Sequence, residues 1–320
     1  MRLIEQQIQQ LQGLDVPTYK ESDFDAFWNE AASKVEESPL EVSDNIIEYP
    51  LAGVDVHDLR FAGLDGTPVA AWYLRPTQVA EPCPVVVQFH GGNGSRDCPV
   101  DHARWLLAGY AVVTMDFRQQ GGTTGSRTPM DRHGNSHWIC GNLEQPHNHY
   151  LYHAWTDAML SVRVAETRPD VRTDQVIVSG SSQGGGTAMV AAALNPRVAL
   201  CLANVPSFCW WEKRVQGRTA CASTIAEYVR RYPDAAERVF QTLSYYDVLH
   251  FADRIRCPLL GSCGLKDTST PPDCVFAAFN KVRSEKRIEI YPFGGHEVRG
   301  VHVEKELAWL RSHLAVDAAL

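Results

Sequence analysis

A serine flanked by glycines carries the clearest chemical signal in the chain. The segment Gly180-Ser181-Ser182-Gln183-Gly184 has the Gly-x-Ser-x-Gly spacing, follows the apolar run Val176-Ile177-Val178 and leads into an Ala-rich stretch. A strand, a sharp turn and a helix form the context in which this motif exposes a reactive hydroxyl. The glycines avoid side-chain collisions at such a tight turn. We therefore predict that Ser182 is a catalytic nucleophile.

A serine nucleophile needs a base and a carboxylate that orients the base, and both candidates follow Ser182 in the chain. Asp267 lies just beyond the strand-like run Pro258-Leu259-Leu260, and His296 lies on a glycine-rich loop after the last apolar run. Asp273 is a rival, but it follows two prolines and suits the first turn of a helix, where an acid complements the dipole. We predict Asp267 as the orienting acid and His296 as the base.

Backbone donors for a negatively charged intermediate are expected in two places. One is the N–H of Gln183, which directly follows the nucleophile. The second is the loop His90-Gly91-Gly92-Asn93-Gly94, which follows the apolar run 85–89 and resembles the His-Gly-Gly signature of lipases and esterases. The alternative is that this segment is only a strand-to-loop turn.

Other chemistry has weaker support in the sequence. His133 and His137, and the group His147, His149 and His153, have spacings that occur among metal ligands. No carboxylate or cysteine completes either set, so hydrogen-bonded histidines are favoured, and we expect no metal and no cofactor. The triple glycine 184–186 is not a phosphate loop, because no Lys-Ser/Thr follows it. The Trp210-Trp211 pair fits either packing or contact with a sugar face.

Composition narrows the choice of partner and compartment. The chain has 320 residues, of which 44% are hydrophobic, and a net charge of −8. That charge argues against nucleic acid or an anionic membrane surface and favours a small neutral substrate. Nine scattered cysteines without a Cys-x-x-Cys pair indicate reduced thiols. The N-terminal residues lack an apolar signal core and no stretch reaches the length of a membrane span, so we expect a cytoplasmic protein.

The positions of apolar residues predict an α/β fold. A helix over 23–37 and alternating strands over 45–49, 54–62 and 69–75 come first, with Gly63 to Gly66 as a hairpin turn. After them the strands become continuous apolar runs, which is typical of a parallel sheet buried on both faces. These runs are 85–89, 111–115, 176–178, 199–202, 258–260 and 287–291, and the helix-period segments between and after them are 101–108, 150–166, 185–194, 272–280 and 303–314. We predict a doubly wound, mostly parallel sheet with an antiparallel N-terminal edge.

We expect one domain over residues 1–320, because no repeat or low-complexity linker interrupts the pattern. Residues 1–80 would form the N-terminal helix and antiparallel extension. A helical insertion over about 207–245 is predicted to cover the site like a cap. The long irregular segment 119–149 is expected to have a functional or contact-forming role.

With these residues assembled, the chain resembles the acetyl xylan esterase and cephalosporin C deacetylase family of α/β-hydrolases over nearly its whole length. The segments that carry the resemblance are 24–28, 90–94, 116–121, 180–185, 204–206, 242–247, 264–267 and 296–297. The resemblance implies a triad of Ser182, Asp267 and His296, with Gly92 and Gln183 supplying backbone N–H groups. It also implies removal of acetyl groups from sugars or related small esters, an intracellular location and assembly into hexamers.

Two departures from the family pattern carry expectations of their own. Gln119 stands where the family usually has glycine, which predicts a local backbone change. Gly92 stands where the family usually has tyrosine, which predicts a wider acyl or alcohol pocket. The alternatives are a peptidase or thioesterase on the same scaffold, a metal-dependent deacetylase, and a hydrolase-like binding protein.

Overall fold

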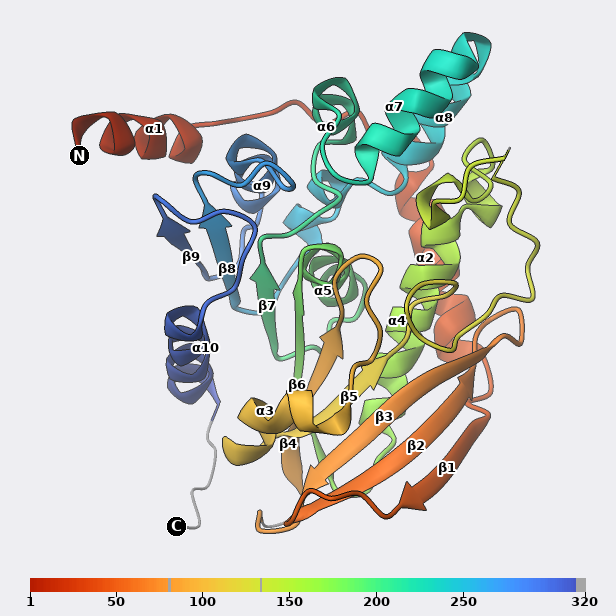
Figure 1. Ribbon diagram of the computed structural model, residues 1–320, viewed down its shortest axis with the longest axis vertical. Helices are drawn as coiled ribbons and strands as arrows, with labels where there is room; N and C mark the ends of the chain where they lie inside the picture. The colour runs from red at the N-terminus through yellow and green to blue at the C-terminus, as the bar shows by residue number, and fades with distance from the viewer. Residues whose placement is uncertain (80–81, 133, 315–320) are drawn as a thin grey trace.

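A nine-stranded sheet forms the centre of the computed structural model, which describes residues 1–79, 82–132 and 134–314 (Figure 1). Its strand order is β1-β2-β3-β5-β4-β6-β7-β8-β9. The strands are β1 (Val42–Ile47), β2 (Val54–Ala62), β3 (Pro68–Pro76), β4 (Cys83–Phe89), β5 (Ala111–Met115), β6 (Val171–Ser181), β7 (Leu200–Asn204), β8 (Leu259–Gly264) and β9 (Lys286–Tyr291).

The sheet is antiparallel at its N-terminal edge and parallel elsewhere. β1, β2 and β3 pair antiparallel, as do β3 and β5, while every pair from β5 to β9 is parallel. β4 lies between β5 and β6, so the winding direction reverses there. Loops at the carboxyl ends of strands beside such a reversal form a crevice suited to ligands. The predicted fold class is confirmed.

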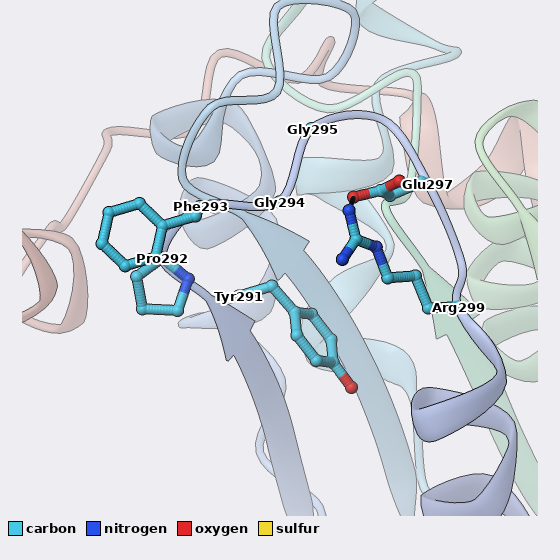
Figure 2. Close-up of a pocket in the computed structure, with 7 residues that line it drawn as sticks. All are labelled: Tyr291, Pro292, Phe293, Gly294, Gly295, Glu297 and Arg299. Atoms are coloured by element: carbon cyan, nitrogen blue, oxygen red, sulfur yellow. Dashed lines mark ion pairs between the residues drawn. The ribbon is translucent and has the colours of Figure 1, made fainter.

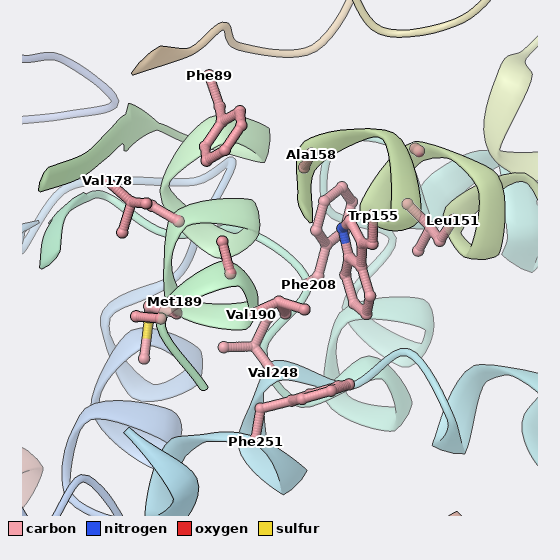
Figure 3. Close-up of a cluster of buried hydrophobic side chains, with 14 of the residues drawn as sticks. Phe89, Leu151, Trp155, Ala158, Val178, Met189, Val190, Phe208, Val248 and Phe251 are labelled. Carbon is pink, nitrogen blue, oxygen red and sulfur yellow. The ribbon is translucent and has the colours of Figure 1, made fainter. Parts of the chain in front are cut away.

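Helices cover both faces of the sheet, and each face has its own apolar core. The helices are α1 (Arg2–Gln12), α2 (Phe24–Glu37), α3 (Ala103–Leu107), α4 (Tyr150–Glu166), α5 (Gln183–Leu194), α6 (Trp211–Gly217), α7 (Ala222–Arg231), α8 (Ala236–Ser244), α9 (Pro272–Phe279) and α10 (Gly300–His313). Because side chains alternate along a strand, Val85 and Val87 of β4 point into the larger core with Trp155, whereas Val86 packs with Trp105 and Leu310. Figure 3 shows part of the larger core, where α4 and α5 meet.

Three helices, α6 to α8, occupy the segment between β7 and β8, where a helical insertion was predicted. In Figure 1 they lie beyond the carboxyl ends of the central strands. The Asp247 carboxylate anchors the start of α6 by accepting hydrogen bonds from the backbone N–H groups of Trp210 and Trp211, both at 2.8 Å. The indole of Trp211 is fully buried and donates to the carbonyl of Tyr246, so this tryptophan serves packing.

A buried arginine joins the loop after β5 to two distant elements. The guanidinium of Arg118 is fully buried and pairs with Asp65 of the β2–β3 hairpin, at 2.7 Å, and with Asp157 of α4. Buried charges are tolerated when they are paired and hydrogen-bonded in this way. The carbonyl of Arg118 also accepts a hydrogen bond from the Tyr150 hydroxyl at 2.8 Å. This network fixes the chain just before Gln119 and Gln120.

All nine cysteines are free thiols, as expected from their spacing. Cys98 is exposed and Cys221 is half-buried, whereas the other seven are buried. Within the described residues, the protein has no helix with the length and apolar character required to cross a bilayer.

Candidate active site

Ser182 sits at the sharp turn between β6 and α5. Its backbone has φ +58° and ψ −116°, in a region where a non-glycine residue is strained and which is often found at functional sites. The Ser182 N–H donates to the carbonyl of Asn204, and its own carbonyl accepts from the N–H groups of Gly186 and Ser207, at 2.9 to 3.0 Å. These bonds hold the strained turn in place and keep the hydroxyl at the carboxyl end of the sheet.

The glycines of the motif are required by close backbone packing. A Cβ atom at Gly184 would lie 2.7 Å from the carbonyl carbon of Phe89 and 2.9 Å from the carbonyl oxygen of His90. A Cβ atom at Gly180 would lie 2.8 Å from the Cα atom of Gly184. Distances under 3.0 Å are essentially never seen for real Cβ atoms. The nucleophile turn therefore packs tightly onto the end of β4.

The structure brings the predicted acid and base into direct contact. His296 Nδ1 lies 2.8 Å from Asp267 Oδ2, and the Asp267 side chain is fully buried. The other carboxylate oxygen accepts from the N–H groups of Ser269 and Thr270, and Thr270 Oγ1 donates to Oδ2 at 2.8 Å. A carboxylate whose two oxygens both accept hydrogen bonds favours the imidazole tautomer with the proton on Nδ1, which is the arrangement that a catalytic Asp–His pair requires.

The same contacts keep the Asp267 carboxyl ionised. Burial acts to raise its pKa, but the hydrogen bonds from His296 and Thr270 together outweigh burial and hold the pKa below its ordinary value. Thr270 has no counterpart in the sequence-based prediction. It lies three residues after Asp267, the position of an ordinary turn, and nothing in the sequence distinguishes it.

A close approach of two loops creates this contact. A Cβ atom at Gly264, the last residue of β8, would lie 2.8 Å from the carbonyl carbon of Gly294, so only glycine fits there. The N–H of Lys266 donates to the carbonyl of Gly294 at 2.9 Å. Figure 2 shows the loop after β9, with the exposed ring of Phe293 on one side and the ion pair of Glu297 and Arg299 on the other. His296 is thus presented on a loop that is tied to the loop of Asp267.

The strand order places Ser182 at the same edge of the sheet as this pair. The predicted nucleophile, acid and base follow strands β6, β8 and β9, and the carboxyl ends of these parallel strands share one edge of the sheet. Within the described part of the chain no hydrogen bond joins Ser182 Oγ to His296. Hydrogen bonds between nucleophile and base are often long before substrate binds and shorten in the reacting complex.

The loop of Gly92 is linked to Gln183 by the side chain of Gln120. Gln120 Oε1 accepts from the N–H of Asn93 at 2.7 Å, while its amide nitrogen donates to Gln183 Oε1 at 3.1 Å and to the Tyr150 hydroxyl at 2.8 Å. The two predicted oxyanion donors, Gly92 and Gln183, therefore belong to segments that one amide holds together. The sequence analysis included Gln120 only as part of the family segment 116–121 and predicted no role for it.

Gln119, the residue before Gln120, adopts a backbone conformation that usually requires glycine. Its φ is +53°, in the left-handed region that favours glycine. A non-glycine residue pays about 1 kcal/mol for this conformation. The N–H of Gln119 donates to the carbonyl of Thr124, and its side chain contacts Arg132. The chain thus tolerates glutamine at a position suited to glycine.

A buried polar chain connects the nucleophile turn with the end of β9. The Asn204 side chain accepts from His302 Nε2 at 2.7 Å and donates to Glu306 Oε1 at 2.6 Å. The Tyr291 hydroxyl completes the chain by donating to His302 Nδ1 at 3.0 Å. Because the backbone carbonyl of Asn204 also accepts from the Ser182 N–H, this chain of hydrogen bonds supports the turn of the predicted nucleophile.

The remaining histidines serve structure in different ways. His149 Nε2 lies 3.0 Å from the carbonyl of Ile139, and His147 packs on Phe27. Both ring nitrogens of His153 are buried without a hydrogen-bond partner among the described residues. His133 lies outside the described residues. Across the described ranges, no three His, Cys, Asp or Glu side chains gather in a metal-binding arrangement.

Acid is expected to destabilise the protein through its buried histidines. Burial lowers the pKa of His149 to about 3 and the pKa values of His153 and His302 to about 4, from 6.5. Below pH 6.5 the unfolded chain therefore binds protons that the folded protein excludes. Stability should be full above pH 7 and should fall between pH 6.5 and 4 by roughly 3 kcal/mol for each histidine.

Urea unfolding at pH 8, 6 and 5 measures this loss of stability. The variant His153→Phe removes one of these sites and should reduce the slope of unfolding free energy against pH. An unchanged slope in this variant would show that His153 does not contribute to the acid sensitivity.

The fold and these groups define the class of protein. A mostly parallel sheet with a strained serine between strand and helix, and an Asp–His pair on two later strands, defines a hydrolase of the α/β-hydrolase fold.

Comparison with known proteins gives the family. The sequence profile of the acetyl xylan esterase (AXE1) family matches residues 1–313, so the chain belongs to this family and is a carboxylic ester hydrolase. The acetyl esterase Axe7A of Xylanibacter ruminicola is 25% identical over 305 residues, which cover 93% of this chain and 68% of that protein.

Two solved structures are similar throughout. The acetyl xylan esterase from Paenibacillus sp. R4 has a TM-score of 0.92 and 32% identity, covering 96% of this chain and 99% of its own. Acetyl xylan esterase 1 from Thermoanaerobacterium sp. JW/SL YS485 has a TM-score of 0.89 and 29% identity, with coverage of 96% and 98%.

Proposed function

We propose that this esterase removes acetyl groups from acetylated sugars and related small esters, such as cephalosporin C, through a covalent acyl-enzyme on Ser182. His296 takes the proton of the Ser182 hydroxyl as it attacks the ester carbonyl, and returns it to the leaving alcohol. Asp267 orients the imidazole and stabilises its charged form. The backbone N–H groups of Gly92 and Gln183 stabilise the negative charge on the carbonyl oxygen. Water then attacks the acetyl-enzyme, with His296 taking its proton and returning it to Ser182 as acetate is released.

The contact between Asp267 and His296 is the observation that carries this proposal. It joins two residues 29 positions apart at 2.8 Å, with a buried, ionised carboxylate facing Nδ1. An acid that is only part of a turn needs no such partner. The strained backbone of Ser182 supports the role of nucleophile independently.

Replacing Asp267 with asparagine tests the assignment. An amide cannot hold the imidazole in the required tautomer, so kcat for p-nitrophenyl acetate should fall by roughly 10³- to 10⁴-fold. The matched control is Asp273→Asn, which removes the rival acid. Asp273 pairs with Lys213 at 3.4 Å in the first turn of α9, and its replacement should leave kcat within about twofold because exposed ion pairs contribute little. A larger loss at Asp273 than at Asp267 would contradict the assignment.

A substrate panel tests the reaction class. Acetate release should be measured with acetylated xylo-oligosaccharides and cephalosporin C, beside an aminoacyl amide and an acyl thioester. The proposal requires higher kcat/KM for the acetyl esters. Preference for the amide or the thioester would assign the alternative peptidase or thioesterase activity, and activity lost on chelation would assign a metal-dependent deacetylase.

We also propose, from the family resemblance, that the protein is cytoplasmic, consists of one domain and assembles into a hexamer. The net charge of −8 agrees with small neutral substrates rather than nucleic acid or a membrane surface. Light scattering coupled to size-exclusion chromatography measures the assembly, and a mass of six chains is expected.

A further inference from the structure

An aromatic ring from a distant loop borders the predicted oxyanion donor. A Cβ atom at Gly92 would lie 3.7 Å from Cζ2 of Trp138 and 3.6 Å from Gln183 Oε1. Both distances are ordinary van der Waals contacts. The volume above Gly92 is therefore open to one further atom and is bounded by the edge of the indole.

Contacts on several sides fix the position of this indole. Trp138 begins the short helical turn η2 (Trp138–Cys140) and is only 4% exposed. Its Nε1 donates to Asn93 Oδ1 at 2.9 Å, in the same loop as Gly92. Its ring packs against Tyr150, with centroids 4.9 Å apart, and meets Phe208 edge-on at 6.4 Å. A ring with these neighbours makes a rigid wall.

The strand order indicates which part of an ester meets this wall. The leaving alcohol must face His296, the proton donor, whose loop follows β9. The loop of Gly92 follows β4, and β4 and β9 lie on opposite sides of β6, the strand of Ser182. With the carbonyl oxygen directed at the N–H groups of Gly92 and Gln183, the acyl group must point away from His296. Trp138 is the aromatic ring that borders Gly92 on this β4 side.

We propose that Trp138 determines acyl-chain specificity by closing the acyl pocket above Gly92. The indole edge contacts the methyl group of an acetyl ester and blocks the additional methylenes of longer acyl chains. This inference rests on the proposed function and identifies a residue that shapes the acyl pocket of the esterase. It also gives a purpose to the long segment 119–149, which supplies the ring.

Two variants with opposite expected effects test the inference. Trp138→Ala should raise the ratio of kcat/KM for p-nitrophenyl hexanoate to that for the acetate by about 10-fold or more, because a methylene is worth 10- to 200-fold in a shaped pocket. Gly92→Ala adds one methyl group to the same volume and should lower the ratio of butyrate to acetate by a similar factor. The φ of Gly92 lies outside the left-handed region and its Cβ contacts are ordinary, so alanine fits.

Controls separate specificity from general damage. Trp210→Ala removes an indole that packs near Lys213, and it should leave the acyl ratio unchanged. With the acetyl group constant and the alcohol varied from p-nitrophenol to methanol, Trp138→Ala should show the wild-type ratio. Trp138→Phe should give an intermediate acyl ratio.

Equal losses for every acyl chain in Trp138→Ala would overturn the inference, as would an unchanged ratio in Gly92→Ala. If Trp138→Ala does not fold, Gly92→Ala and Trp138→Phe decide the outcome. Failure of the proposed function itself is separate, because it would appear as undiminished hydrolysis by Ser182→Ala.

Discussion

Ser182→Ala is expected to lower kcat for p-nitrophenyl acetate by roughly 10⁴- to 10⁶-fold, because it removes the atom that forms the acyl-enzyme. Alanine keeps the Cβ atom, so the strained backbone and its three hydrogen bonds should persist. Thermal unfolding should therefore be close to that of the wild type. Residual hydrolysis would come from the oxyanion donors and from substrate positioning.

The same motif provides a matched control. Ser181 precedes the nucleophile and ends β6, so Ser181→Ala changes one serine of the motif without touching the proposed chemistry. Its activity should stay within a few-fold of wild type. A fluorophosphonate probe should label the wild type and Ser181→Ala but not Ser182→Ala. Labelling of Ser182→Ala, or hydrolysis at the wild-type rate, would exclude Ser182 as the nucleophile.

Gly184→Ala is expected to cost more than about 4 kcal/mol of stability, the range reserved for severe structural conflicts. Its Cβ atom would meet backbone atoms of Phe89 and His90, which cannot rotate away as a side chain does. Relief would require β4 and α5 to separate, which would pull apart the loops of Gly92 and Ser182. Little soluble protein is expected, and any that is recovered should be inactive.

Gly125→Ala is the matched control for this substitution. A Cβ atom at Gly125 would meet nothing within 4 Å, and its φ lies outside the left-handed region. Soluble yield and melting temperature should therefore equal those of the wild type or rise slightly. A Gly184→Ala protein that melts within a few degrees of wild type would show that the turn can relax, contrary to the packing described above.

Regular elements were predictable wherever a pattern of apolar residues reported burial. The helix over 150–166 and the strand over 54–62 match α4 and β2 in both bounds. α1 was not predicted, because Leu11 is the only buried residue among its eleven. β6 begins at Val171, earlier than the apolar run 176–178, because its first half is partly exposed and polar.

Only the part of the site that depends on chain order and on position at the ends of strands was predictable. Ser182, Asp267 and His296 follow from those two rules, and the structure adds the contact of the last two. The supporting residues did not follow. Thr270 acts within the turn of Asp267, where nothing in the sequence distinguishes it from an ordinary turn residue. Gln120 acts through contacts between separate segments that no local pattern encodes. Trp138 lies 46 positions from Gly92, so the sequence indicated only that a tyrosine was missing there.

The distribution of thiols makes this enzyme convenient for single-site chemical labelling. Cys98 is the exposed cysteine, and burial raises the pKa values of the other eight, including half-buried Cys221. Since only thiolates react with maleimides, a fluorophore should attach at Cys98 without mutagenesis. Cys98 lies between β4 and the helical turn that begins at Pro99, so the dye would mark the same connection that carries Gly92 and Asn93.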